Sequence, residues 1–176
     1  MRRNLIRLLF GISLTFTILS VVYLAFFEGY KDITDGRTHR EAFDLFADTE
    51  GVYEVKIYLV MGEGKSDGTF PIRPYNRDEP TYGSVSLTGD ELKSFLDVWQ
   101  YQEVSWGSQA MCHDPAYGFR IYRRGKLTRE TSICWSCNNF YVTPYPGMAT
   151  WYGFNATTKS AKELLQFCDK LLPYKR

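Results

Sequence analysis

Histidine and net charge are both scarce in this chain, and each scarcity excludes a class of function. The two histidines are His39 and His113. His39 falls in a region expected to be solvated, which leaves His113 as the sole candidate for a general base. Lysine and arginine nearly balance aspartate and glutamate, for a formal net charge of +1. Because nucleic-acid binding needs a basic surface, we expect no nucleic-acid partner.

The chain also lacks a cofactor-binding loop and a recognisable catalytic constellation. Gly64-Lys65-Ser66 matches the last three residues of a phosphate-binding loop. That motif also needs a glycine five residues before Gly64, where this chain has Leu59, and a helix after the serine, for which there is no pattern here. Ser108 and Cys112 are near His113 along the chain, and close neighbours in sequence usually point apart rather than form a nucleophile–base pair. We therefore expect no cofactor and a non-catalytic protein.

One long apolar run stands near the N-terminus. Leu8 to Phe27 contains no charged side chain, and at about 1.5 Å per residue a helix of this length reaches about 30 Å, enough to cross a bilayer. The run ends in bulky residues, which favours an uncleaved anchor over a removable signal peptide. Arginines at 2, 3 and 7 precede it and place the N-terminus in the cytoplasm. We expect a single-pass protein whose domain lies outside the cytoplasm, most simply in the periplasm on a bacterial inner membrane.

The predicted fold class is α+β: a single transmembrane helix followed by one mainly antiparallel sheet with two packed amphipathic helices. Residues 52–61 alternate in a strand pattern, while 89–100 and 158–172 carry apolar stripes at helical spacing. A hairpin is expected to turn at Arg124-Gly125, because glycine supplies a positive φ. We predict a cytoplasmic tail at 1–7, the anchor at 8–27, a juxtamembrane helix and linker at 28–50, and the extracytoplasmic domain at 51–176.

The four cysteines are Cys112, Cys134, Cys137 and Cys168. Cys168 falls on the apolar stripe of the last helix, where a core thiol is expected. Outside the cytoplasm a disulfide is expected among the other three. Cys112 paired with Cys134 or Cys137 closes a loop worth about 3 kcal/mol, and the sequence leaves the choice open. Cys134 and Cys137 can bond each other only across a tight turn.

Two further interpretations of these cysteines stay open. Cys112, His113, Cys134 and Cys137 have the composition of a Cys3His zinc site, although the adjacent pair is awkward geometry for two ligands. Cys134 and Cys137 also have the spacing of a redox dithiol, but both flanks look like strands rather than a helix start. A thiol or zinc protein is thus the alternative to a binding protein, and zinc is the one alternative cofactor.

The leading hypothesis is a non-catalytic binding or envelope-support module with an unknown protein or small-molecule partner. Residues 62–83 predict a long exposed loop rich in glycine and proline. A cleft between this loop and the following strands is one place for a partner to bind, since exposed aromatics mark binding surfaces. Its candidate lining residues are Tyr75, Tyr82, Trp106 and Tyr117.

Residues 112–142 resemble a loosely defined group of small uncharacterised bacterial proteins with a Cys, Pro and Gly followed by Cys-aromatic-x-Cys. The chain departs from the group at Tyr117, where histidine is frequent. The resemblance implies that the three-cysteine region is the centre of the domain, and it implies no activity. The matching positions are Cys112, Pro115, Gly118, Arg120, Ile133, Cys134, Trp135 and Cys137.

Overall fold

A computed structural model describes residue 20 and residues 45–73, 75, 77–105, 112–144 and 150–174. The chain separates into two units, Met1–Arg40 and Glu41–Arg176. Apart from Ser20, which is helical, every described residue belongs to the second unit.

The predicted fold class needs a correction at its first element. Within the described part of the chain, no helix has the length and apolar character needed to cross a membrane. The stretch for which the membrane helix was predicted, residues 8–27, lies outside the described residues apart from Ser20. The fold class is therefore corrected to a mostly antiparallel sheet with a few helices, an α+β arrangement.

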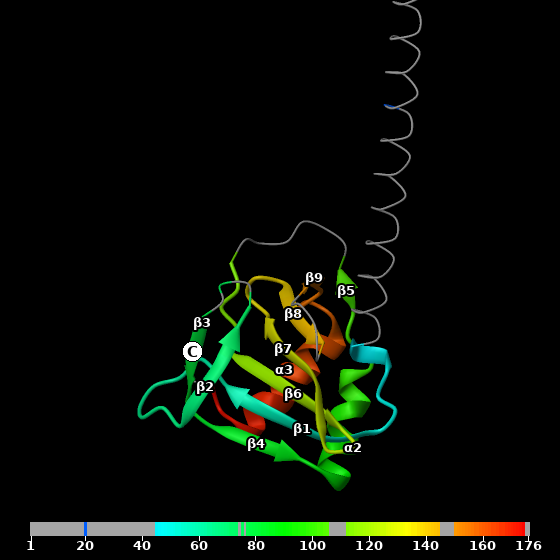
Figure 1. Cartoon of the computed structure of the whole chain (residues 1–176), viewed down its shortest axis with the longest axis horizontal. Coiled ribbons are helices and arrows are strands. Elements are labelled where there is room, and N and C mark those ends of the chain that lie inside the picture. Colours follow the sequence, from blue (N-terminus) through cyan, green and yellow to red (C-terminus); the bar gives the residue numbers. More distant parts are fainter. Residues whose placement is uncertain are drawn as a thin grey trace, which may run out of the picture. The chain divides into compact units, whose positions relative to one another are not determined.

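A seven-stranded antiparallel sheet forms the centre of the second unit (Figure 1). Its strand order is β4-β1-β6-β7-β8-β9-β5, so the four strands from β6 to β9 follow one another both in space and in the chain. The β6–β7 hairpin turns at Arg124 (φ 46°) and Gly125 (φ 78°), the positive φ values that a two-residue hairpin loop requires. The strands are β1 (Val52–Leu59), β4 (Ser84–Leu87), β5 (Val104–Ser105), β6 (Tyr117–Arg123), β7 (Lys126–Cys134), β8 (Asn139–Pro144) and β9 (Thr150–Phe154).

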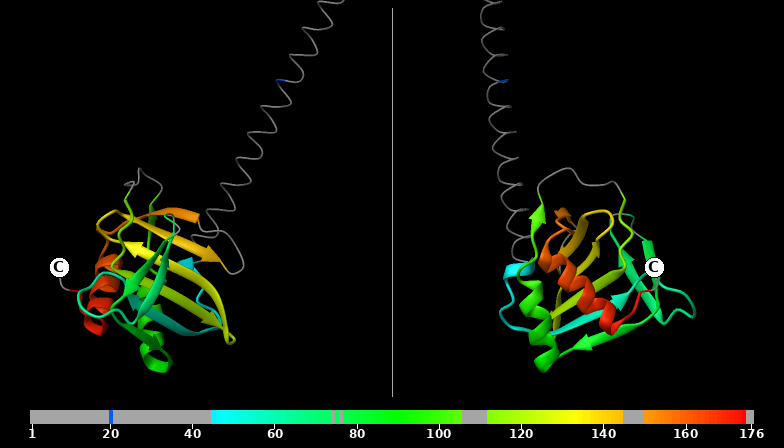
Figure 2. Two further views of the ribbon diagram at one scale, coloured as in Figure 1. Left: turned by 60° about the vertical axis from the view of Figure 1, so that its left-hand side comes forward. Right: turned by 180° about the vertical axis from the view of Figure 1, so that it is seen from behind.

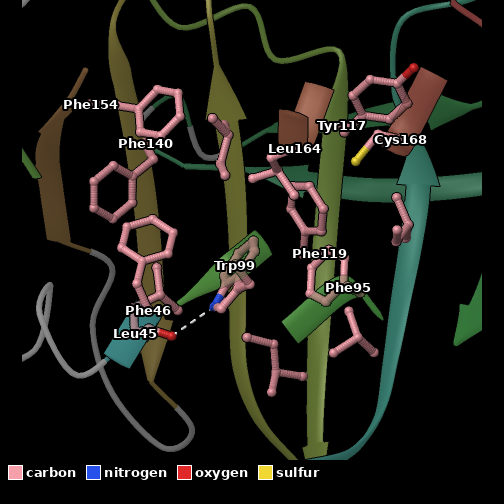
Figure 3. Packing of buried hydrophobic residues seen from close by; sticks show 14 of the residues in the cluster. Leu45, Phe46, Phe95, Trp99, Tyr117, Phe119, Phe140, Phe154, Leu164 and Cys168 are labelled. Atoms are coloured by element: carbon pink, nitrogen blue, oxygen red, sulfur yellow. Dashed lines mark hydrogen bonds between the residues drawn. The ribbon is translucent and has the colours of Figure 1, made fainter. Parts of the chain in front are cut away.

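Two helices, α2 (Gly89–Trp99) and α3 (Lys159–Leu171), lie together over one face of the sheet (Figure 2). Alternate residues of the central strands, among them Ile57, Phe119 and Phe140, point to this face and are fully buried. Trp99 packs among them, and its indole N–H donates to the carbonyl oxygen of Leu45 at 2.9 Å (Figure 3). Residues just before β1 are thereby fixed to the main core.

The opposite face of the sheet carries a separate hairpin made of β2 (Gly68–Ile72) and β3 (Arg77–Thr81). Phe70 and Ile72 form a second apolar cluster with Tyr58 and Val60 of the β1 side. The contact is close because Gly118 of β6 has no side chain: a Cβ there would lie 2.5 Å from Phe70 Cε1. The predicted loop over 62–83 therefore contains a hairpin that covers the second face.

Candidate functional site

Polar side chains form a row across the second face, beneath the β2–β3 hairpin. Because side chains alternate along a strand, burial of Phe119 and Ile133 toward the helices turns Arg120, Glu130 and Ser132 to this face. Arg120 pairs with Glu130 across β6 and β7. Strand alternation alone would place these polar side chains on a solvent-exposed face, but the β2–β3 hairpin covers most of them.

The first part of the row is an ion pair. Arg120 Nε donates to Glu130 Oε2 at 2.8 Å, and its Nη1 donates to the Tyr58 hydroxyl at 3.0 Å. The guanidinium also lies over two rings, 4.9 Å from the Tyr58 centroid and 5.5 Å from that of Phe70. The Glu130 side chain is 4% exposed and that of Arg120 is 27% exposed, so the carboxylate is buried, and the arginine above it contacts both the sheet and the hairpin.

The second part of the row is a chain of hydrogen bonds through His113. Its Nδ1 lies 2.6 Å from Asn139 Oδ1 and its Nε2 lies 2.7 Å from Ser132 Oγ. Asn139 Nδ2 donates to the carbonyl oxygen of Cys112 at 2.7 Å, which leaves Oδ1 as the acceptor. His113 therefore carries its proton on Nδ1, and Nε2 accepts from the Ser132 hydroxyl. Burial lowers the pKa of His113 more than the Asn139 hydrogen bond and Asp114 raise it, which favours the neutral ring that this arrangement of donors and acceptors needs.

Ser132, His113 and Asn139 have the order of a serine–histidine–asparagine relay, in which a base activates a hydroxyl and a third group orients the base. All three side chains of this relay are buried. Ser132 is 2% exposed, and His113 and Asn139 are fully buried. The gap beside Ser132 under Phe70 is too narrow to admit a water molecule. In this conformation the relay joins residues 112–116 to β7 and β8.

Three cysteines meet at the end of the β7–β8 hairpin. Cys112 and Cys137 form a disulfide with a Cα–Cα distance of 5.8 Å, which confirms that a disulfide is present and selects Cys137 over Cys134. Cys134 is a free, buried thiol, and so is Cys168 in the main core. Burial raises the pKa of the Cys168 thiol, with the nearby Asp169 adding to the rise, as expected for an inert core residue.

Each of the predicted zinc ligands forms a disulfide or hydrogen bonds in this structure. Cys112 and Cys137 are joined to each other, and both ring nitrogens of His113 have hydrogen-bonding partners. The Cys134 sulfur donates to the carbonyl oxygen of Asp114 at 3.3 Å. Within the described ranges, no three His, Cys, Asp or Glu side chains are placed to hold a metal ion. Zinc binding stays a prediction that requires opening of the disulfide.

The four aromatic residues predicted to line a cleft do not share one surface. Tyr75 is 41% exposed and lies under the Arg77 guanidinium, 4.9 Å from its ring centroid. Tyr82 is half-buried against the main core. Tyr117 is fully buried, and its hydroxyl lies within 2.9 Å of Asp169 Oδ1 and 2.8 Å of the Leu172 carbonyl oxygen. Trp106 lies outside the described residues.

Ser132 and Asn139 were missed by sequence reasoning, although each has a signal in the sequence. Ser132 lies just before the apolar pair Ile133 and Cys134, and Asn139 just before Phe140 and Tyr141, and polar side chains that are buried in such places need partners. His113 is 26 residues from Asn139 and 19 residues from Ser132 along the chain, so only the folded sheet shows that it is the partner of both.

Comparison with known proteins returns no relative. No protein-family model, curated protein or solved structure matches this chain. The resemblance of residues 112–142 to a group of small bacterial proteins therefore stays an expectation.

Proposed function

We propose that the domain is an extracytoplasmic, non-catalytic module that binds or supports a partner in the cell envelope. The observation that carries this proposal is the sealed relay: Ser132, His113 and Asn139 are at most 2% exposed. Their hydrogen bonds serve to fix residues 112–116 on the sheet. The Cys112–Cys137 disulfide supports a location in an oxidising compartment, because such bonds are rare in the cytosol.

The surface proposed for the partner is the outer side of the β2–β3 hairpin around Tyr75 and Arg77. Both side chains are well exposed, at 41% of the residue for Tyr75 and 50% of the side chain for Arg77. Tyrosine and arginine are enriched at protein interfaces. Arg77 also lies 3.8 Å from Asp114, next to the disulfide loop. The hairpin that carries this surface is anchored by the fully buried Phe70 and Ile72, and a preorganised surface loses little conformational entropy when a partner binds.

Site-specific photo-cross-linking in producing cells tests the binding surface. A benzophenone amino acid replaces Tyr75 in one variant and Tyr101 in the control. Tyr101 is 67% exposed and follows α2, away from the hairpin. We expect a discrete cross-linked adduct from position 75 and none from position 101. Absence of an adduct at position 75, or the same adducts from both positions, contradicts the proposed surface.

A second experiment tests the non-catalytic part of the proposal. The purified full chain is treated with a fluorophosphonate probe, which labels activated serine hydroxyls. We expect no labelling, because Ser132 is covered by the hairpin. Labelling of the wild type that disappears in Ser132→Ala contradicts the proposal and identifies an enzyme.

A further inference from the structure

The free, buried thiol of Cys134 lies beside the Cys112–Cys137 disulfide. The chain between Cys134 and Cys137 turns tightly, because Trp135 to Asn138 form the loop of the β7–β8 hairpin. Asn138 supplies a positive φ of 54° for this turn. A turn of this kind brings residues three apart within the Cα separation that a disulfide spans, about 7 Å.

Contacts inside the turn place the Cys134 sulfur close to Cys137. The backbone N–H of Cys137 donates to this sulfur at 3.3 Å. Ser136 Oγ lies 3.3 Å from the Cys134 sulfur and 3.9 Å from the Cys137 sulfur. Cys137 therefore has two neighbouring sulfurs available, the one it is bonded to on Cys112 and the one on Cys134.

We propose that Cys112, Cys134 and Cys137 form a thiol–disulfide exchange site in which Cys134 is the attacking thiol and Cys112 the outward-facing sulfur. The Cys134 thiolate attacks the Cys137 sulfur and forms a Cys134–Cys137 bond. The Cys112–Cys137 bond breaks, and its electron pair leaves on Cys112, which takes up the proton that Cys134 lost. The step needs no oxidant, since one disulfide replaces another.

The three cysteines differ in solvent exposure, so the exchange changes where the free thiol lies. Cys134 is fully buried and Cys137 is 3% exposed, whereas Cys112 is exposed. Exchange therefore moves the reactive thiol from the interior to the surface. There the Cys112 thiolate attacks a partner disulfide, forms a mixed disulfide with one of its sulfurs and releases the other as a thiolate. The co-reactant class is a molecule that carries a disulfide.

The structure also keeps Cys112 in place after its bond breaks. Its carbonyl oxygen accepts from Asn139 Nδ2 at 2.7 Å, and the next residue, His113, is held by Ser132 and Asn139. The hydrogen bond from the Cys134 thiol to the Asp114 carbonyl oxygen is lost when Cys134 gives up its proton, whereas the bonds of Asn139 and His113 involve no cysteine sulfur. Loss of the covalent bond thus leaves the loop bound to the sheet, which permits exchange within the folded protein.

The test is trapping of the exchanged form in the full chain under native, mildly alkaline conditions without reductant. Iodoacetamide traps any exposed thiol, and peptide mass spectrometry then locates the alkylated cysteine and the disulfide. We expect wild-type protein to accumulate alkylated Cys112 together with a Cys134–Cys137 disulfide. Oxidised glutathione as the probe should give a mixed disulfide on Cys112.

Three variants complete the design. Cys134→Ser and Cys134→Ala should both lose all Cys112 labelling and keep the Cys112–Cys137 bond, while Cys168→Ser serves as the matched control and should label like the wild type. Unfolding curves check that each variant is folded. The proposal is overturned if wild-type Cys112 stays bonded and unlabelled, or if Cys112 is labelled equally in a folded Cys134 variant. A negative result leaves the proposed binding surface untouched, whereas a positive result replaces the non-catalytic part of that proposal with thiol–disulfide exchange.

Discussion

Replacing Gly118 by alanine should destabilise the domain by forcing the β2–β3 hairpin away from the sheet. The added Cβ would lie 2.5, 2.6 and 2.7 Å from three ring atoms of Phe70, whereas an ordinary carbon–carbon contact is about 3.5–4.0 Å. The ring is fully buried and lies between Tyr58, 5.2 Å away between centroids, and the Arg120 guanidinium. It must therefore move by about 1 Å against packed neighbours, and overpacking of this kind costs about 1–3 kcal/mol.

Denaturant unfolding of the full chain measures this cost, and two variants make the result specific. Ser86→Ala, on an exposed position of β4, controls for substitution in a strand and should stay within about 0.5 kcal/mol of the wild type. Phe70→Leu removes the ring atoms that the new methyl meets. The double variant Gly118→Ala with Phe70→Leu should therefore be more stable than the sum of the two single effects predicts. A Gly118→Ala protein as stable as the Ser86→Ala control refutes the reasoning about the close contact.

Three more predictions concern stability. Replacing both Cys112 and Cys137 by alanine opens a loop with a sequence separation of 25 and should lower the free energy of unfolding by about 3 kcal/mol. An unchanged denaturant midpoint would show that the disulfide does not stabilise the fold. Lowering the pH should weaken the fold below about 6.5, by at most about 1.4 kcal/mol per pH unit. The unfolded chain takes a proton on His113 there, while burial lowers the pKa of that group below its ordinary value of 6.5 in the fold. His113→Gln should flatten this slope, and an equal slope in the variant contradicts the assignment. Arg120→Leu removes the ion-pair partner of Glu130, whose side chain is 4% exposed, and should cost about 3 kcal/mol. The double variant with Glu130→Leu should regain most of it, and failure to do so shows that packing rather than charge dominates.

The strand and helices that were predicted well are those in which apolar residues recur at a regular spacing over the whole element. The strand expected over 52–61 appears as β1 (Val52–Leu59), and the helices expected over 89–100 and 158–172 appear as α2 and α3. The turn at Arg124-Gly125 is confirmed by the positive φ of both residues. In each case local geometry is enough to specify the element.

The second face of the sheet was beyond the reach of such patterns. Alternation shows which residues share a face, but it does not show what covers that face. Glu130 and Ser132 are buried because the β2–β3 hairpin and the loop at His113 pack over them. The hairpin itself comes from a stretch rich in glycine and proline, whose sequence allows short strand pieces within a loop but does not show that they pair with each other. The disulfide partner depends on the same long-range packing, so the sequence could not choose between Cys134 and Cys137.

The sheet ends in two short strands, β4 (Ser84–Leu87) at one side and β5 (Val104–Ser105) at the other. A long, flat edge strand offers unpaired backbone groups to any passing chain and is a route to aggregation, and short edge strands limit that risk. The same shortness makes this sheet a poor template for a peptide that binds by adding a strand. A partner is therefore expected to recognise side chains on the hairpin surface instead of extending the sheet.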